Sequence, residues 1–329
     1  MSLPVYLAPM EGVTDHVYRR VHHTHFTGVE KYFIPFISPT QDLCLTNREK
    51  RDISPANNAG LFAVPQILTK RADHFLWAAQ ILLDMGYTEV NLNAGCPSGT
   101  VTGKGKGAGL LLDLPALENM LDEIYAHAPM RVSIKTRIGF SDPIEFDRVL
   151  ELYKQYPVHE LIVHPRTRME YYRGLPHRET YANALTGTQL PMVYNGDLFT
   201  PDNCTQLEQS MPSHALMIGR GLLANPALAR EYAGGAPITI PELAAFVDDL
   251  TRAYGEVHPG NVVLGRMREV LKNIVCCFAD ADKAKKAIRK ASTLPALEDA
   301  ATRLFDGYAL RDNPGFIPEN RHIHSTTSF

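Results

Sequence analysis

Eight short apolar runs, each followed by polar residues or glycine, constrain the fold of this 329-residue chain more than any other feature. Their richness in Val, Ile and Leu is typical of strands buried on both faces of a parallel sheet. In chain order the runs are Val5–Ala8, Tyr32–Phe36, Phe62–Gln66, Val90–Asn93, Val132–Thr136, Leu161–His164, Met192–Asn195 and Ala215–Gly219.

Helix-like stretches separate most of these runs, with apolar residues at helical spacing or a proline at the first turn. They are Ala72–Met85, a stretch opened by Pro115, Phe146–Tyr153, Pro201–Leu207 and Pro226–Tyr232, with Pro39–Asn58 expected as a long loop containing some helix. Alternating strands and helices in this number predict an α/β fold, a (β/α)8 TIM barrel. A doubly wound open sheet is the alternative, but the turn after the first run, Pro9–Gly12, lacks the GxGxxG pattern.

The chain changes character after the eighth run. Gly234–Pro237 is typical of a linker, and only helical patterns follow it. These later patterns cover Pro241–Val257, Val262–Phe278, Asp282–Ala291 and Pro295–Gly307. We therefore expect residues 1–237 to form the barrel, residues 238–318 a C-terminal all-α helical bundle, and residues 319–329 a disordered tail.

Composition narrows the class of protein. No run of about 18 apolar residues occurs, and no basic and then apolar leader opens the chain, so we expect no membrane span and no secretion. The five cysteines lack CxxC spacing, which argues against metal binding and disulfides and favours the cytoplasm. A net charge of −3 means that any RNA-binding surface must be local. We expect a monomer.

Polar residues follow the predicted strands, where a barrel of this type gathers its functional groups. Asn195–Asp197 follows the seventh run and Gly219–Gly221 the eighth, the usual place for a phosphate in such barrels. Glycine lets the backbone approach a ligand closely, although these glycines could also serve only to make tight turns. Together they predict a phosphate-bearing ligand.

A cysteine and a glycine-rich segment follow the fourth run. Cys96 lies in Asn91–Ser98, and Gly103–Gly109 comes next with Lys104 and Lys106. A free thiol has a pKa of about 8.5, so it is mostly protonated at neutral pH and can act as a general acid. The alternative is a buried structural cysteine. The segment is interpreted as a flexible loop that could close as a lid, with lysines that either touch phosphates or are simply solvated.

Two further strand ends carry cations. Lys135 ends the fifth run, where a buried amine is costly unless it meets an anion. That anion is a ligand or, alternatively, a carboxylate such as Asp197 or Glu11. His164 and Arg166 follow the sixth run on one strand face and could bind a phosphate or a base edge.

Taken together, these motifs resemble the tRNA-dihydrouridine synthase family, in order through the barrel and more loosely in the helical region. The resemblance rests on Ala8–Asp15, Asn93-x-Gly95-Cys96-Pro97-Ser98, Lys135, His164–Arg166, Asn195–Asp197 and Gly219–Gly221. Many members carry a lysine in the run just after Cys-Pro, whereas here that run is Ser98–Val101 and contains no lysine.

The resemblance implies a flavoprotein oxidoreductase that holds FMN, takes electrons from NADPH, and reduces the 5,6 double bond of uridines in tRNA. It makes Cys96 the proton donor. The residues it implies at FMN are Pro9, Met10, Glu11, Gln66, Lys135, His164, Asn195, Gly196, Asp197, Gly219 and Arg220. It implies Asn93 and Arg166 at the uracil, and we add Lys104 and Lys106 as candidate contacts to the RNA.

A modified base must leave its stack, so contacts to the RNA should be mostly to its backbone and shape. Lys283, Lys286 and Lys290 lie on one predicted helix face, which either binds RNA or is merely solvated. Two other functions compete. One is an FMN barrel that reduces a free pyrimidine or enone, and the other is a non-catalytic RNA-binding relative. Turnover on tRNA compared with free uracil, and bleaching of a yellow protein by NADPH, would separate them.

Overall fold

A closed, all-parallel barrel forms the larger part of the molecule, as the eight apolar runs predict. The computed structural model describes residues 2–318, and the tail expected at residues 319–329 lies outside them. The strands are β1 (Val5–Leu7), β2 (Val29–Ile37), β3 (Ala63–Ile67), β4 (Glu89–Ala94), β5 (Arg131–Arg137), β6 (Leu161–His164), β7 (Met192–Tyr194) and β8 (Ala215–Ile218). They pair in chain order, and β8 closes on β1 through Val5–Leu216 and Leu7–Ile218.

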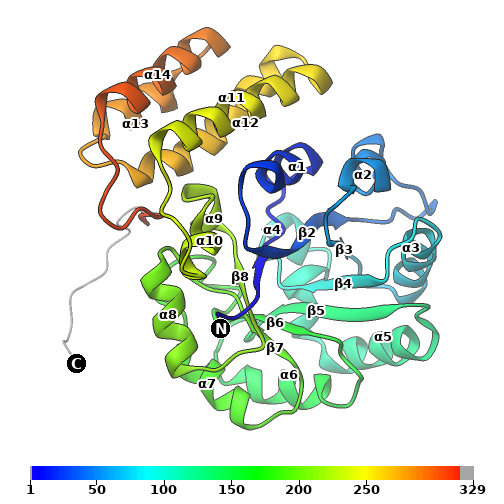
Figure 1. Ribbon diagram of the computed structural model, residues 1–329. Helices are drawn as coiled ribbons and strands as arrows, with labels where there is room; N and C mark the ends of the chain where they lie inside the picture. The colour runs from blue at the N-terminus through cyan, green and yellow to red at the C-terminus, as the bar shows by residue number, and fades with distance from the viewer. Residues whose placement is uncertain (1, 319–329) are drawn as a thin grey trace.

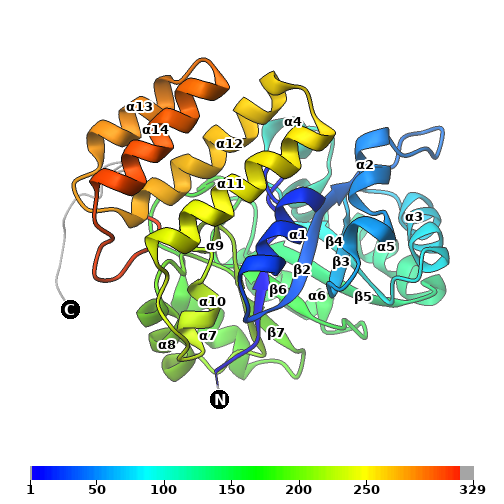
Figure 2. The same cartoon turned by 45° about the horizontal axis from the view of Figure 1, so that its top comes forward.

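The barrel has two apolar layers. Alternate strand residues such as Tyr6, Phe33 and Ile162 fill its interior, whereas their neighbours pack against the surrounding helices. The helices of the barrel region are α1 (His16–His25), α2 (Asn47–Asp52), α3 (Ala72–Asp84), α4 (Gly99–Thr102), α5 (Leu114–His127), α6 (Glu145–Tyr153), α7 (Arg178–Thr186), α8 (Pro201–Ser210), α9 (Arg220–Ala224) and α10 (Leu228–Tyr232), with 3-10 turns η1 (Pro55–Asn58) and η2 (Gly107–Leu112). Figures 1 and 2 show the helices around the strands.

Local sequence explains where many of these helices begin. Asp113 and Thr200 accept hydrogen bonds from the first turns of α5 and α8, and both helices carry proline in that turn. Thr46 and Glu49 form a reciprocal capping box at α2. Caps of this kind fix where a helix leaves the rim, and so fix the loops that carry the polar strand-end residues.

The C-terminal region is helical, as its sequence predicts. It comprises α11 (Ile240–Val257), α12 (Gly260–Ile274), the 3-10 turn η3 (Val275–Cys277), α13 (Asp282–Lys290) and α14 (Leu294–Gly307). These helices lie over α1 and α9 at one side of the barrel (Figure 1). The domain boundary between residues 237 and 238 stays a prediction. Within residues 2–318, no helix is long and apolar enough to span a membrane.

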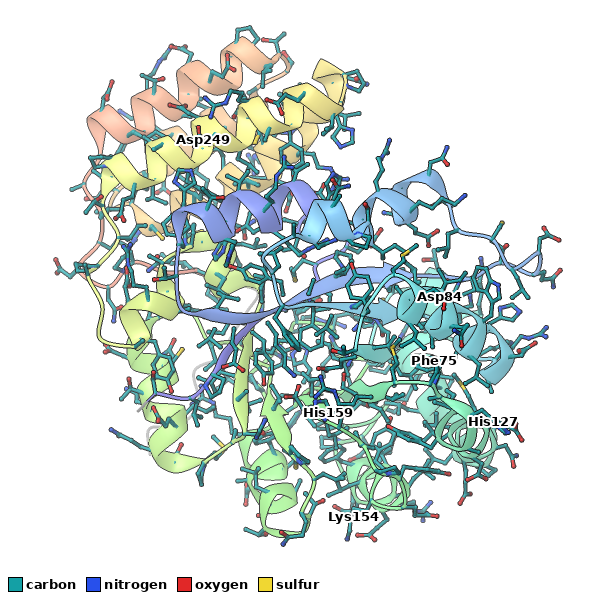
Figure 3. The ribbon with its side chains drawn as sticks, turned by 45° about the vertical axis from the view of Figure 1, so that its right-hand side comes forward. Phe75, Asp84, His127, Lys154, His159 and Asp249 are labelled. Carbon is teal, nitrogen blue, oxygen red and sulfur yellow. The ribbon has the colours of Figure 1, made fainter. Side chains whose placement is uncertain are left out.

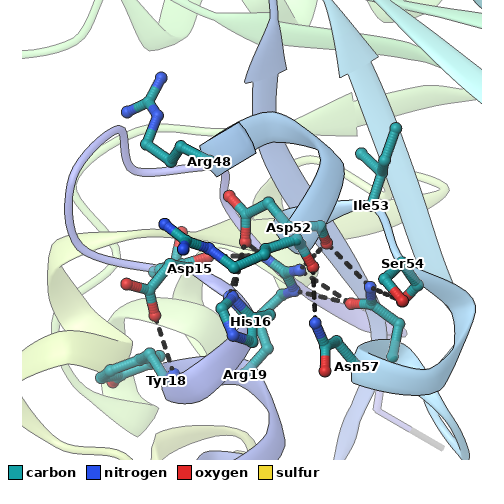
Figure 4. Close-up of polar contacts among 12 residues, drawn as sticks. Asp15, His16, Tyr18, Arg19, Arg48, Asp52, Ile53, Ser54 and Asn57 are labelled. Carbon is teal, nitrogen blue, oxygen red and sulfur yellow. Dashed lines mark hydrogen bonds and ion pairs between the residues drawn. The ribbon is translucent and has the colours of Figure 1, made fainter. Parts of the chain in front are cut away.

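The junction between barrel and bundle centres on α1. Asp15 caps α1 and also accepts from Tyr254 Oη of α11 at 2.9 Å, with Arg266 of α12 at 3.6 Å. Deeper in α1, the fully buried Arg19 donates to Asp52 and Asn58, which ties α1 to α2 and η1 (Figure 4). The bundle is therefore held at the first strand–helix unit of the barrel.

Candidate active site

The strand ends expected to bind a phosphate-bearing ligand surround one cavity of about 540 Å³, a volume that includes its open mouth. Nine of the eleven residues expected at FMN line it, from the ends of β1 and β5 to β8. They are Pro9, Met10, Lys135, His164, Asn195, Gly196, Asp197, Gly219 and Arg220. The structure thus brings together residues that are as much as 211 positions apart, from Pro9 to Arg220.

Lys135 is a cation without a carboxylate partner among residues 2–318. Its Nζ donates to Asn195 Oδ1 at 2.7 Å, and Asn195 Nδ2 donates to Met217 O at 2.7 Å. Burial first, and then the charge of Arg137, lowers the pKa of Lys135 to about 7. The alternative of a salt bridge to Asp197 or Glu11 is wrong, because those carboxylates pair with arginines. A buried amine that lacks a carboxylate partner favours the binding of an anionic ligand.

Asp197 organises the far side of the cavity. It adopts a left-handed φ of 46° and accepts from Arg220 Nη2 at 2.6 Å and from Arg166 Nη1 at 3.0 Å. Asp197 is the only acidic side chain among the described residues that line the cavity. One carboxylate therefore faces several cations, and the surplus positive charge suits a phosphate.

Arg166 does not line the cavity. Its side chain is 1% exposed, and its guanidinium donates to Asp197, His164 Nε2, Arg173 O and Gly174 O. Those bonds leave the guanidinium no free edge for a uracil. Arg166 therefore holds Asp197 from outside the cavity. Because an arginine can only donate, His164 Nε2 accepts and its proton lies on Nδ1. Burial, then the neighbouring cations, lowers the pKa of His164 well below 6.5, so the ring is neutral.

Cys96 follows the end of β4 and is close enough to Lys135 of the cavity for the charges of the two groups to interact. Its thiol is half-buried and free, and burial raises its pKa above the usual value. The thiol therefore stays protonated at neutral pH, as a general acid requires. Asn93 Oδ1 accepts from the Cys96 amide at 2.9 Å and from the Gly95 amide at 3.1 Å.

Asn93 and Gln66 stabilise the backbone at Gly95 and Cys96 and do not line the cavity. Asn93 Nδ2 donates to Gln66 Oε1 at 2.7 Å, and the two residues are 7% and 1% exposed. Glu11 is also placed elsewhere, with its carboxylate against Arg48 in a neighbouring cleft. Nine of the residues expected at FMN therefore line the cavity, whereas Gln66 and Glu11 do not.

The glycine-rich segment after Cys96 is folded, not an irregular loop. It follows α4 and runs through a turn at residues 103–105 into η2, where Gly107, Ala108 and Gly109 are buried. Ala108 N donates to Cys96 O at 3.1 Å, and a Cβ at Gly107 would lie 2.9 Å from that oxygen. Its glycines therefore allow the close packing that fixes Cys96.

Two residues of the site were missed from the sequence. Arg137 donates from Nε to Gly95 O at 3.0 Å and from Nη1 to Thr167 O at 2.8 Å, bracing the Cys96 turn. Tyr172 lies at the cavity mouth, with its ring 4.9 Å from the Arg220 guanidinium. The period of two along β5 puts Arg137 on the same face as Lys135, which could have indicated it.

The protein is a closed (β/α)8 barrel with a cation-rich cavity at the ends of β7 and β8, where barrels of this class frequently have a phosphate-binding site. A family model described as Dihydrouridine synthase (Dus) matches residues 6–302. Since this match covers most of the chain, the chain belongs to the dihydrouridine synthase family, as its motifs predict.

Individual relatives agree with the family. The tRNA-dihydrouridine(16) synthase of Escherichia coli (strain K12) is 27% identical over 311 residues, which cover 90% of this chain and 96% of the relative. The tRNA-dihydrouridine(16) synthase of Ralstonia nicotianae is 27% identical over 91% of this chain and 96% of its own. The tRNA-dihydrouridine synthase B of Pasteurella multocida is 29% identical over 69% of this chain and 68% of its own.

Proposed function

We propose that this protein is an oxidoreductase that reduces the 5,6 double bond of a uridine in tRNA, with FMN as cofactor and NADPH as reductant. The observation that carries the proposal is a half-buried Cys96 thiol, kept protonated by burial, close to Lys135 of a cavity in which that lysine pairs with no carboxylate among residues 2–318. Membership of the dihydrouridine synthase family supports the reaction class. The cytoplasm, where tRNA and NADPH occur, is the proposed location.

The residues that line the cavity support the proposal of FMN. A Cβ at Gly219 would lie 3.1 Å from Met10 Sδ, so glycine keeps the space beside Met10 open for a flat ring. Arg220 and the proton on His164 Nδ1 would hold the phosphate, and Lys135 would place its ammonium against the polar edge of the ring. When bound, FMN supplies hydride chemistry with electrons from NADPH.

Cys96 supplies the other half of the reduction. Adding hydrogen across a carbon–carbon double bond requires one hydride and one proton, and the Cys96 Sγ–H would give that proton to the uracil carbon that receives no hydride. The thiolate left behind would recover a proton from solvent, which its raised pKa favours. Asn93 and Arg137 would keep the thiol in place through the backbone of residues 95 and 96.

Position 16 is the proposed site of reduction in the tRNA. The relatives named for position 16 align over 90% or more of this chain, whereas the barrel ends near residue 237. Such an alignment must extend into the helical region, which is the candidate surface for RNA. Synthase B of Pasteurella multocida aligns over only 69% of the chain.

The test is turnover of the purified protein on unmodified tRNA and on free uridine. The proposal predicts a yellow protein, bleached by NADPH without oxygen, that forms dihydrouridine at position 16 of tRNA and leaves free uridine unreduced. Equal turnover on free uridine would favour the competing small-molecule oxidoreductase. A colourless protein that binds tRNA without changing it would favour the non-catalytic relative.

A further inference from the structure

Three lysines gather on the side of the barrel mouth opposite the cavity. Lys70 follows β3, and Lys104 and Lys106 follow β4. Lys106 Nζ is partly buried and donates to Ser38 Oγ, just beyond β2, at 2.9 Å. The ends of β2, β3 and β4 thus contribute to one place, whereas the cavity is lined from β1 and β5 to β8.

A left-handed turn brings the three lysines close together. Gly105, between Lys104 and Lys106, has a φ of 69°, and a Cβ built on it would lie 3.4 Å from Lys70 Cδ and 3.7 Å from Lys70 Nζ. The Lys70 amine therefore lies against the backbone that separates the other two lysines. Burial, then repulsion from Lys104 and Lys70, lowers the pKa of Lys106.

Within residues 2–318, no acidic side chain forms an ion pair with this cluster. In the described part of the chain, none of the three lysines forms an ion pair within 4.0 Å, although other exposed lysines such as Lys154 and Lys272 do. The carboxylate that acts on Lys106 is Glu49, whose oxygens already accept from the Ser38 amide at 2.8 Å and from Thr46 Oγ1 at 2.7 Å. Cations held together without an acid favour a bound anion.

The lysine cluster is tied to the proton donor by the backbone. Lys106 is followed by Gly107 and Ala108, and the Ala108 amide donates to Cys96 O at 3.1 Å. The contact of Gly107 with the same oxygen leaves the segment little freedom. An anion bound by the lysines would therefore sit at a fixed place relative to the Cys96 thiol.

We propose that Lys70, Lys104 and Lys106 form a phosphate-binding site that takes a phosphodiester of the RNA strand next to the uridine being reduced. The inference rests on the proposed function. A strand whose base enters the mouth must pass over its lip, where lysines that track the backbone hold it without reading its sequence. The phosphates of the reductant share this chemistry, so the experiment has a separate arm for them.

The experiment compares the holoenzyme with a variant carrying Lys70→Gln, Lys104→Gln and Lys106→Gln. Lys154→Gln is the matched control, because Lys154 directly follows α6, lies on the opposite side of the molecule from Asp249 of the bundle, and pairs with Glu151 (Figure 3). The readouts are the Kd for tRNA at several salt concentrations, the KM for tRNA, and the rate of flavin reduction by NADPH without RNA. Flavin content and Tm check that each variant is folded.

The triple variant is expected to raise the KM for tRNA at least tenfold and to lower the slope of log affinity against log salt by about 0.7–0.9, which is the contribution of one neutralised phosphate. Flavin reduction by NADPH should not change, and Lys154→Gln should match the wild type. Arginine at all three positions should restore tRNA binding. If the triple glutamine variant loses its flavin, Lys104→Gln alone, at an exposed position, should raise the KM and lower the salt slope by a smaller amount than the triple variant.

Unchanged tRNA affinity in a folded triple variant, beside a wild type that forms dihydrouridine, would overturn the inference. Slower reduction by NADPH with normal tRNA binding would assign the site to the reductant's phosphates and overturn the RNA assignment. A wild type that forms no dihydrouridine in any tRNA would instead refute the proposed function, which keeps the two failures distinct.

Discussion

Two buried lysines at opposite ends of the barrel meet opposite surroundings. Lys31, at the amino end of the strands, lies 2.9 Å from both Glu89 and Glu160. Lys135, at the carboxyl end, donates to the amide oxygen of Asn195 at 2.7 Å and pairs with no carboxylate among residues 2–318. The charge at one end is neutralised within the protein, whereas the charge at the other end is left for a ligand. Burial of a cation alone therefore does not indicate function, but burial without an acid does.

A chain of side-chain hydrogen bonds joins the two ends through the barrel. From the amino end, its members are Glu89, Ser133, Asn91, Gln66, Asn93 and the Cys96 amide, at successive donor–acceptor distances of 2.9, 3.0, 2.7, 2.7 and 2.9 Å. The amino end thus supports the turn that carries the thiol, although it takes no part in the chemistry. The two ends differ in role but share one scaffold.

The largest effect on stability is expected at the amino end. Lys31→Met would leave Glu89 and Glu160, which are 1% and 3% exposed, without their shared cation. Breaking a buried ion pair in this way costs about 3–5 kcal/mol of unfolding free energy. Denaturant unfolding at neutral pH measures the cost. A free energy of unfolding within about 1 kcal/mol of the wild type would show that Lys31 and Lys135 do not differ in this way.

The same substitution at the carboxyl end should act on the ligand instead. Lys135→Met is expected to weaken FMN binding at least tenfold, since a hydrogen bond to a charged group contributes about 1.5–3 kcal/mol. The unfolding free energy of the flavin-free protein should stay the same or rise, because an unneutralised buried amine is removed. Titration of flavin-free protein with FMN measures the affinity. Wild-type affinity for FMN would show that Lys135 serves another purpose.

Two glycines extend the comparison to the backbone. Gly107 and Gly86 both have positive φ, of 58° and 91°, but a Cβ at Gly107 would lie within 3.0 Å of Cys96 atoms, whereas nothing lies within 4 Å at Gly86. Gly86→Ala, before β4, should show only the left-handed penalty of about 1–2 kcal/mol. Gly107→Ala should add about 1–3 kcal/mol from overpacking and slow tRNA turnover by displacing Cys96. Equal turnover in both variants would show that this contact does not position the thiol.

The smallest expected effect is a pH dependence at Lys135. Burial holds its pKa at about 7, below the ordinary 10.5, so between these values the unfolded chain binds a proton that the folded chain lacks. The stability of the flavin-free protein should therefore rise with pH above 7 relative to Lys135→Met, while FMN affinity falls. A Tm series of both proteins from about pH 6 to 9 tests the sign. A constant Tm difference would show that Lys135 does not titrate there.

The strands could be predicted from the sequence because burial on both faces requires nearly continuous apolar runs. The α1 helix could not, because its sequence is polar and its buried Arg19 and His22 are satisfied only by tertiary partners such as Asp52 and Tyr32. The α7 helix was also missed, since it buries only Tyr181 and Ala184 along its nine residues.

The cavity was predictable in part for a related reason. In a parallel barrel every strand end reaches the same rim, so strand-end residues were expected to converge. How they pair was not predictable. The sequence placed Arg166 and Asp197 at the rim, but their contact depends on the register of β6 with β7. The folded state of the glycine-rich segment likewise depends on its tertiary contact with Cys96.

The rate of dihydrouridine formation by the Cys96→Ala holoenzyme tests the central claim most directly, because the thiol's only assigned task is to give a proton to the base. The account predicts wild-type FMN content, normal bleaching by NADPH, and tRNA turnover reduced about 100- to 10,000-fold, the usual contribution of a general acid. Wild-type turnover in this variant would contradict it and place the proton donor elsewhere on the rim.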